Sequence, residues 1–325
     1  MQALTERTLA PLLARRAAWL LCGLWLLAGV VGHDPWKADD ALHLGVAWSM
    51  AGGDWLVPRI AGDPWLVGPP LYHWLAALCG KLFGWLLPWH DAARLASALF
   101  GGLYLVVISR TAYRLDGGSA ALAAPLLAVG TLGMLVPMHD AQPAIAAIAG
   151  FAIALRGLAI WQQQATRGAS IFGLGLGISF LAAGGDIAAI ELATAFTLML
   201  HSGWRRRESL KAWAIALGIA LALALPWPLL LWQQAPALFE LWRSAELASL
   251  GFRGGAGLNH LEMLAWAAWP VLPLALWTLW LERRKALQAQ NFLMLAAAAW
   301  ATLLFVTDAP RAASLLPALV PLTLL

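Results

Sequence analysis

The chain has 325 residues, of which 61% are hydrophobic and only 12% are charged, whereas an average soluble domain has about 25% charged residues. Together with a mean hydropathy of +0.72, this composition excludes a disordered chain, argues against a soluble globular domain and indicates a polytopic membrane protein. The two cysteines, Cys22 and Cys79, lie in apolar stretches and form neither a disulfide framework nor a zinc site.

Ten apolar segments follow one another along the chain. They cover residues 17–32, 92–109, 119–138, 141–155, 168–185, 187–203, 212–231, 263–281, 286–307 and 312–325. A helix needs about 20 apolar residues to cross a bilayer, so the pattern predicts an all-α bundle with about ten spans, in one domain over residues 1–325. The last segment ends abruptly at Leu325, which indicates a fragment or a shortened relative of a longer protein.

The basic residues predict the orientation of these spans. A cytoplasmic N-terminus places 14 of the 21 basic residues inside, namely Arg7, Arg15, Arg16, Arg110, Arg114, Arg156, Arg167, Arg205, Arg206, Arg207, Lys211, Arg283, Arg284 and Lys285. The basic pI of 9.4 therefore reflects the positive-inside rule, and we expect no nucleic-acid partner. The first segment lacks an A-x-A cleavage pattern, so we interpret it as a retained helix.

Residues 33–91 form an unusually long outer loop. The loop holds six aspartates and seven of the 20 tryptophans, a composition that predicts a functional segment lying along the membrane surface. Within it, residues 71–87 are predicted to form an interfacial or re-entrant helix. If this stretch were a span, every later segment would be inverted and the three arginines at 205–207 would lie outside.

Another stretch of the loop, residues 38–51, predicts a helix. Leu42, Val46 and Met50 recur at intervals of four and form an apolar stripe. Asp39 or Asp40 is expected to cap the helix start. Asp39 also shares a face with His43, where a carboxylate could act as a general base or bind a cation. An ordinary cap is the alternative.

Short motifs in and after the loop carry a resemblance to a known family. They read Asp39-Asp40, Gly53-Asp54-Trp55-Leu56-Val57-Pro58, Gly62-Asp63-Pro64, Gly68-Pro69-Pro70-Leu71-Tyr72-His73-Trp74 and Ala93-Arg94-Leu95. The pattern resembles GT-C membrane glycosyltransferases of the ArnT-like and dolichyl-phosphate-mannose-protein mannosyltransferase-like group, whose loop reads D-E, G-D-W-L-x-P, E-K-P-P-L-Y-Y-W and A-R-L. The likeness continues through Leu225-Pro226-Trp227, residues 269–277, and Arg311 with Leu315-Leu316-Pro317.

The resemblance implies a GT-C-type bundle in a bacterial inner membrane that transfers a sugar, with inversion, from a polyprenyl-phosphate donor to a lipid or protein acceptor on the outer face. Lipopolysaccharide or protein glycosylation is the expected process. Asp39 takes the position of the family's catalytic base, and Asp40, the second expected catalytic residue, replaces the family's glutamate and supports the base. Expected substrate-binding residues are His43, Arg59, Tyr72, His139, Asp140, Arg253 and Arg311. No cofactor is firmly implied, although the family's E-K pair leaves room for a divalent metal.

Several positions depart from the family pattern and keep other functions open. Val67-Gly68 replace the E-K pair, and Ala183 stands where a lysine is common. Each charge-assisted phosphate contact contributes roughly 1.5–3 kcal/mol, so the losses favour the alternative of a pseudoenzyme that binds lipid-linked sugar or acts as a scaffold. A polyprenyl-lipid transporter is the third alternative. Asp186 at a short outer turn and Glu191 inside a span are additional candidates.

Overall fold

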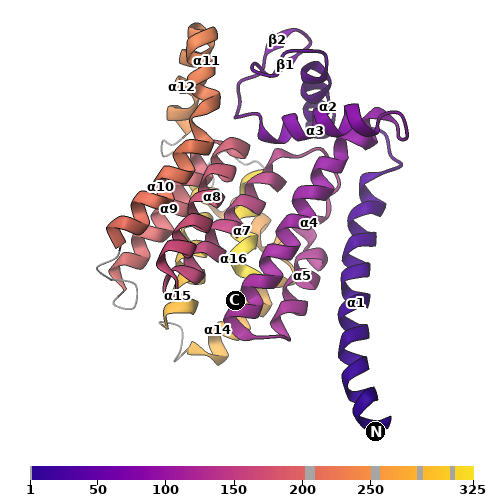
Figure 1. Cartoon of the computed structure of the whole chain (residues 1–325), viewed down its shortest axis with the longest axis vertical. Helices are drawn as coiled ribbons and strands as arrows, with labels where there is room; N and C mark the ends of the chain where they lie inside the picture. Colours follow the sequence, from indigo (N-terminus) through magenta and orange to yellow (C-terminus); the bar gives the residue numbers. More distant parts are fainter. Residues whose placement is uncertain (1, 202–208, 250–256, 284–287, 308–311) are drawn as a thin grey trace.

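The computed structural model describes residues 2–201, 209–249, 257–283, 288–307 and 312–325 (Figure 1). Its helices are α1 (Gln2–Val30), α2 (Ala38–Ala51), α3 (Leu71–Phe83), α4 (Trp89–Asp116), α5 (Ala120–Gly130), α6 (Leu132–Leu135), α7 (Pro143–Trp161), α8 (Ala165–Ala183), α9 (Gly185–Leu200), α10 (Ser209–Ala224), α11 (Pro226–Gln234), α12 (Pro236–Ser249), α13 (Gly257–Ala267), α14 (Val271–Leu281), α15 (Ala289–Thr307) and α16 (Leu316–Leu322). A 3₁₀ turn, η2 (Ala312–Leu315), precedes α16.

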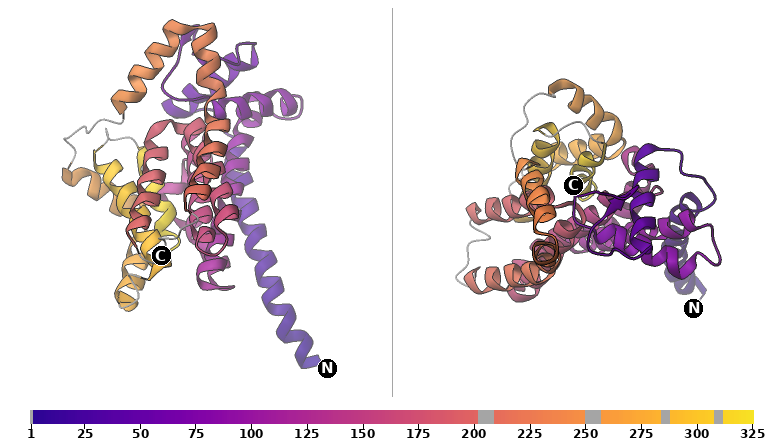
Figure 2. Two further views of the ribbon diagram at one scale, coloured as in Figure 1. Left: turned by 60° about the vertical axis from the view of Figure 1, so that its left-hand side comes forward. Right: turned by 90° about the horizontal axis from the view of Figure 1, so that it is seen from above.

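The long helices run together along the molecule, and the loop after α1 covers one end of them (Figure 1). This cap consists of α2, α3 and a small antiparallel hairpin, β1 (Arg59–Ile60) with β2 (Asp63–Pro64). Helices α11 and α12 rise at the same end, while α1 runs down one edge toward the opposite end (Figure 2). The predicted helix over residues 38–51 is confirmed as α2.

The bundle is built around α7, which is buried along nearly its whole length. Glycines allow α7 and α8 to approach closely, as small residues do between membrane helices. A Cβ atom added at Gly157 would lie 2.3 Å from the backbone nitrogen of Phe172, and one added at Gly168 would lie 2.4 Å from the backbone of Trp161. At these glycines the backbone atoms of α7 and α8 therefore pack directly against each other.

We expect Gly157→Val to destabilise the bundle, because a new side chain there meets backbone that cannot move aside. Overpacking of this kind costs about 1–3 kcal/mol. The matched control is Gly218→Val in α10, where an added Cβ meets nothing within 4 Å. Thermal unfolding in detergent should show a lower midpoint for Gly157→Val only. Equal midpoints for the two variants would contradict this account of the helix contact.

The segments predicted as spans correspond to helices, but several are broken. Three described helices, α4, α7 and α8, are long and apolar enough to cross a membrane, and the α10–α11 pair, bent by 41°, would make a fourth. Segment 119–138 divides into α5 and α6, and segment 263–281 divides into α13 and α14. The count of about ten spans stays a prediction.

Two expectations for the loop can be compared with the structure. The helix predicted at 71–87 is α3, which crosses the direction of α4 instead of running along it (Figure 1). The predicted cap of α2 is wrong, because Lys37 is the N-cap and no side chain caps the helix start. The carboxylate of Asp40 is turned into the protein, where it binds an arginine.

Candidate active site

A cavity of about 530 Å³ lies where the cap meets the bundle. Helix α2, the loop before α3, and α3 itself form one wall, while the ends of α7, α8, α9, α15 and α16 form the other. The cavity is lined by Asp39, Leu42, His43, Trp65, Val67, Gly68, Pro69, His73, Gln142, Pro143, Ala144, Ala182, Ala183, Asp186, Ile187, Leu304, Ser314 and Pro317. Segments far apart in the sequence thus enclose one space.

The two neighbouring aspartates of α2 have different environments. Asp39 is exposed and lines the cavity. Asp40 is fully buried, with its carboxylate 2.6 and 3.1 Å from two nitrogens of Arg94, and it also accepts the backbone N–H of Ala141 at 2.7 Å. The carboxylate of Asp40 therefore accepts three hydrogen bonds from the protein. Asp40, expected as a catalytic residue beside Asp39, is bound by Arg94 and does not line the cavity.

Arg94, which we did not select as a site residue, organises the base of the cap. Its side chain is fully buried and bonds Asp40, Asp91 (3.1 Å) and the carbonyl of His33 (2.7 Å). Asp91 in turn accepts the N–H of Gly32 at 2.9 Å. One guanidinium therefore joins the end of α1, the start of α2 and the start of α4. Bidentate arginine–carboxylate pairs fix geometry in this manner, so Arg94 positions the helix that carries Asp39.

Tyr72 and Asp140, both expected to bind substrate, do not line the cavity. The hydroxyl of Ser97 donates to the carbonyl of Asp140 at 2.6 Å, so Tyr72 must donate its own proton to Ser97, 2.7 Å away. The carboxylate of Asp140 lies 3.8 Å from the Nζ of Lys37. Burial, followed by the charge of Asp40, raises the pKa of Asp140.

His43 lines the cavity as expected, and it pairs there with His73. The Nδ1 of His43 lies 3.1 Å from the Nε2 of His73, and Trp65 packs edge-on against both rings. A hydrogen bond between two imidazoles requires that one nitrogen donate and the other accept. Burial lowers the pKa of His43 to about 4 and that of His73 well below its ordinary value. Both rings are therefore neutral at pH 7 and offer hydrogen bonds but no positive charge.

This pair predicts a pH dependence of stability. Because the folded-state pKa of His43 is about 4 and the unfolded value is about 6.5, the unfolded chain binds more protons between these pH values. The stabilisation is complete above pH 6.5 and falls as the pH drops, by up to about 1.4 kcal/mol per pH unit for each histidine. We expect the unfolding midpoint to drop between pH 7 and pH 4, and to drop less in His43→Gln. The control is His90→Gln, outside the cavity; equal drops in all three proteins would contradict the assignment.

The remaining candidates lie elsewhere or outside the described residues. The ring of His139 packs on Trp25 of α1, with Nε2 3.0 Å from the Trp25 carbonyl oxygen. Arg59 pairs with Asp54 at 3.0 Å and donates to the carbonyl of Gly62, which braces the hairpin. Arg253 and Arg311 fall in segments 250–256 and 308–311, outside the described residues.

Two acidic residues in the bundle also have structural partners. Glu191 is buried, and the hydroxyl of Ser179 on α8 donates to one of its oxygens at 2.5 Å. Asp186 lines the cavity and accepts a hydrogen bond from Ser249 of α12 at 3.1 Å. Glu246 of α12, which sequence reasoning missed, accepts the N–H of Gly185 at the start of α9. An anionic side chain therefore already occupies this helix N-terminus, where dipoles favour negative charge.

The described lining of the cavity contains carboxylates but no lysine or arginine. Val67, Gly68 and Ala183, which replace charged residues of the family pattern, all line it. Within the described ranges, no three His, Cys, Asp or Glu side chains lie close enough together to hold a metal ion, so these residues do not fit a metal site. The described residues of this cavity supply carboxylates and hydrogen-bonding imidazoles.

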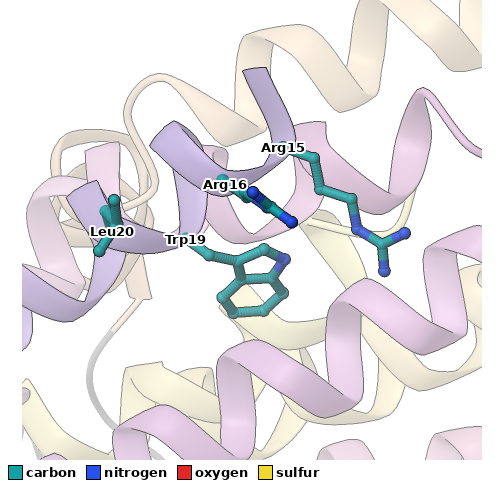
Figure 3. A pocket seen from close by; sticks show the side chains of 4 residues that line it. All are labelled: Arg15, Arg16, Trp19 and Leu20. Atoms are coloured by element: carbon teal, nitrogen blue, oxygen red, sulfur yellow. The ribbon is translucent and has the colours of Figure 1, made fainter. Parts of the chain in front are cut away.

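A second hollow of about 570 Å³ opens beside α1. Its lining side chains are Arg15, Arg16, Trp19 and Leu20, all from one face of that helix (Figure 3). None of these four residues is a carboxylate, an imidazole or a thiol, so this hollow is not a candidate reaction centre.

Comparison with known proteins gives a consistent family and fold. The family described as dolichyl-phosphate-mannose-protein mannosyltransferase matches residues 67–232. An undecaprenyl phosphate-alpha-4-amino-4-deoxy-L-arabinose arabinosyl transferase of Pseudomonas paraeruginosa (strain DSM 24068 / PA7) is 26% identical over 66% of this chain and 40% of its own length. Transferase 1 of that name from Sodalis glossinidius (strain morsitans) is 26% identical over 93% of this chain and 58% of its own length. The chain therefore spans about half the length of these relatives.

A solved structure extends the comparison to the fold. The crystal structure of ArnT from Cupriavidus metallidurans bound to undecaprenyl phosphate superposes with a TM-score of 0.82 at 18% identity, covering 95% of this chain and 58% of that one. At this identity the likeness establishes the fold. The predicted all-helical GT-C-type bundle is confirmed.

Proposed function

Because the chain belongs to the dolichyl-phosphate-mannose-protein mannosyltransferase family, we propose that it is an integral membrane glycosyltransferase. It takes a sugar from a polyprenyl-phosphate donor and passes it to a lipid or protein acceptor, as the names of its relatives suggest. We place residues 1–325, as one domain, in a bacterial inner membrane with the N-terminus in the cytoplasm and the cavity facing outside. The distribution of basic residues supports this orientation.

The observation that carries the proposal is the division between the two aspartates. Asp39 lines the cavity, whereas Asp40 forms an ion pair with Arg94. This ion pair fixes the start of α2. An exposed carboxylate on a rigid element suits a general base. In the proposed step the carboxylate of Asp39 takes the proton of the acceptor hydroxyl or amine. The acceptor atom bonds the anomeric carbon from the face opposite the phosphate, the bond from that carbon to the phosphate oxygen breaks, and polyprenyl phosphate leaves.

The leaving phosphate requires stabilisation that the described lining supplies only in part. The neutral His43–His73 pair keeps one free N–H that can donate a hydrogen bond to the phosphate or to a sugar hydroxyl, but without a charge it does not replace a lysine. Arg253 and Arg311 therefore stay the expected cationic partners. Leu304 and Ser314, which line the cavity, lie four positions before and three positions after segment 308–311 in the sequence.

A second function, donor binding without turnover, is favoured by one specific observation. Val67, Gly68 and Ala183 face the cavity at positions where the family pattern has charged residues. A cavity whose described lining holds no lysine or arginine could still bind the apolar lipid and the sugar while failing to stabilise the transition state. This is the pseudoenzyme alternative.

Release of polyprenyl phosphate distinguishes the two functions. The protein in nanodiscs is supplied with polyprenyl-phosphate sugars and with lipid or peptide acceptors, and both released polyprenyl phosphate and retained donor are measured. We expect release that depends on the acceptor and falls in Arg311→Gln. Retained donor without any release would overturn the transferase proposal and support the binding protein.

A further inference from the structure

Four arginines surround a second polar hollow at the end of the bundle away from the cavity. Arg110 and Arg114 lie in the last turns of α4, Arg156 lies near the end of α7 and Arg167 lies at the start of α8. The cavity described above lies at the other ends of α7 and α8 (Figure 1). The hollow has a volume of about 330 Å³, at the lower limit of small-molecule pockets, about 300 Å³.

Hydrogen bonds hold two of these side chains in place. Arg114 donates to the carbonyl of Ala159 at 3.2 Å and to the side chain of Gln163 at 2.7 Å. Arg167 donates to the side-chain oxygen of Gln164 at 3.1 Å. All of these acceptors are neutral, so they orient the guanidinium groups without neutralising them.

Arg156 provides an independent sign that the hollow suits an anionic ligand. Its side chain is half-buried, and its Nη1 atom is shielded from solvent without any hydrogen-bond partner among the described residues. A buried charged donor without a partner is costly. Within the described part of the chain, none of the four arginines forms an ion pair, and no acidic residue lines the hollow.

We propose that this arginine pocket, formed by Arg110, Arg114, Arg156 and Arg167, binds the phosphate groups of an anionic ligand. The planar guanidinium fork matches phosphate oxygens in a bidentate way. Several guanidinium groups around one small space suit a ligand with more than one negative charge, such as a free diphosphate or the headgroup of a bisphosphate lipid. In the proposed orientation the pocket opens at the cytoplasmic surface, where anionic lipid headgroups are available.

Basic residues that only determine the membrane topology would not need to gather around one hollow. Arg15 and Arg16 on α1 are exposed and lie in a separate hollow, so they represent that simpler role (Figure 3). The arginine pocket differs because its four charges come from three helices, and one of them is partly withdrawn from water. Binding at this pocket does not depend on the proposed transferase activity.

Two probes test the pocket and separate the two sources of phosphate. Inorganic pyrophosphate is titrated into protein held in phosphatidylcholine nanodiscs, and retention of cardiolipin over phosphatidylcholine is measured by native mass spectrometry. We expect the wild type to bind at least one probe, and Arg110→Gln with Arg156→Gln to weaken that binding by about tenfold or more. Pyrophosphate binding alone identifies a soluble ligand, and cardiolipin retention alone identifies a lipid headgroup; either supports the proposal.

Control variants keep the test decisive. Arg110→Gln with Arg167→Gln changes only exposed side chains of the pocket, so weaker binding in this variant is not a folding effect. Arg15→Gln with Arg16→Gln removes the same charge outside the pocket and should bind as the wild type does. Failure of the wild type to bind either probe, or equal weakening in the pocket and α1 variants, would overturn the proposal.

Discussion

Replacing Arg94 by methionine is expected to lower the free energy of unfolding by about 3–5 kcal/mol, the cost of removing one partner of a buried ion pair. The substitution leaves the carboxylates of Asp40 and Asp91 buried without their cation, and it frees the carbonyl of His33. Both side chains of the Arg94–Asp40 pair are fully buried, so water cannot replace the lost contact. Thermal and chaotrope unfolding in detergent measure the effect.

Two comparisons make the Arg94 measurement specific. Arg59→Met removes an arginine from a partly exposed pair with Asp54, and it should cost at most about 1 kcal/mol. Arg94→Lys keeps the charge but cannot reach Asp40, Asp91 and the His33 carbonyl together, so its midpoint should lie between those of the wild type and Arg94→Met. Similar midpoints for Arg94→Met and Arg59→Met would contradict the assigned role of Arg94.

The sequence predicts α2 well because local information determines it. The spacing of Leu42, Val46 and Met50 is enough to predict a helix over 38–51, and Val46 and Met50 are indeed buried. The same spacing places Asp39 and His43 on one face, and both line the cavity. The predicted cap failed because an aspartate at a helix start has two competing uses. Asp40 bonds an arginine 54 positions away instead of its own backbone.

Long-range partners account for most of what the sequence could not predict. Arg94 stood inside the family-like Ala93-Arg94-Leu95 motif, yet no spacing rule connects it to Asp40. Glu246 contacts Gly185 across 61 positions and gave no local signal. His73 was visible in the motif beside Tyr72, but its pairing with His43 depends on how α3 lies against α2. The local sequence determines which segments form helices, whereas the polar pairs around the cavity depend on contacts between segments that are far apart in the sequence.

The breaks within the apolar segments could also not be predicted from their composition. Hydrophobicity alone joins residues 212–231 into one segment, but Pro226 lacks an N–H and begins a new helix, α11, bent by 41° from α10. Between α5 and α6 the break is different, because Thr131 has an extended backbone there and no proline stands at the junction. Apolar composition therefore locates membrane-embedded segments without counting the helices within them.

Asp39→Asn is expected to reduce acceptor-dependent release of polyprenyl phosphate by about 10²–10⁴-fold, the usual contribution of general base catalysis. The amide retains the size of the carboxylate but cannot take the acceptor proton. Donor binding should change little, because the donor contributes no proton to this residue. The unfolding midpoint should also stay near that of the wild type, since Asp39 is exposed and makes no ion pair within the described residues.

The contrast with neighbouring carboxylates determines how the Asp39 result is read. Asp63→Asn, on the exposed hairpin, makes the same chemical change outside the cavity and should leave release unchanged. Asp40→Asn should lower the unfolding midpoint as well as turnover, because it breaks the pair with Arg94. A large loss in Asp39→Asn at normal stability therefore identifies the base, whereas full activity in that variant would assign the proton to another group. Asp186, the other carboxylate in the described lining of the cavity, would then be the residue to substitute next.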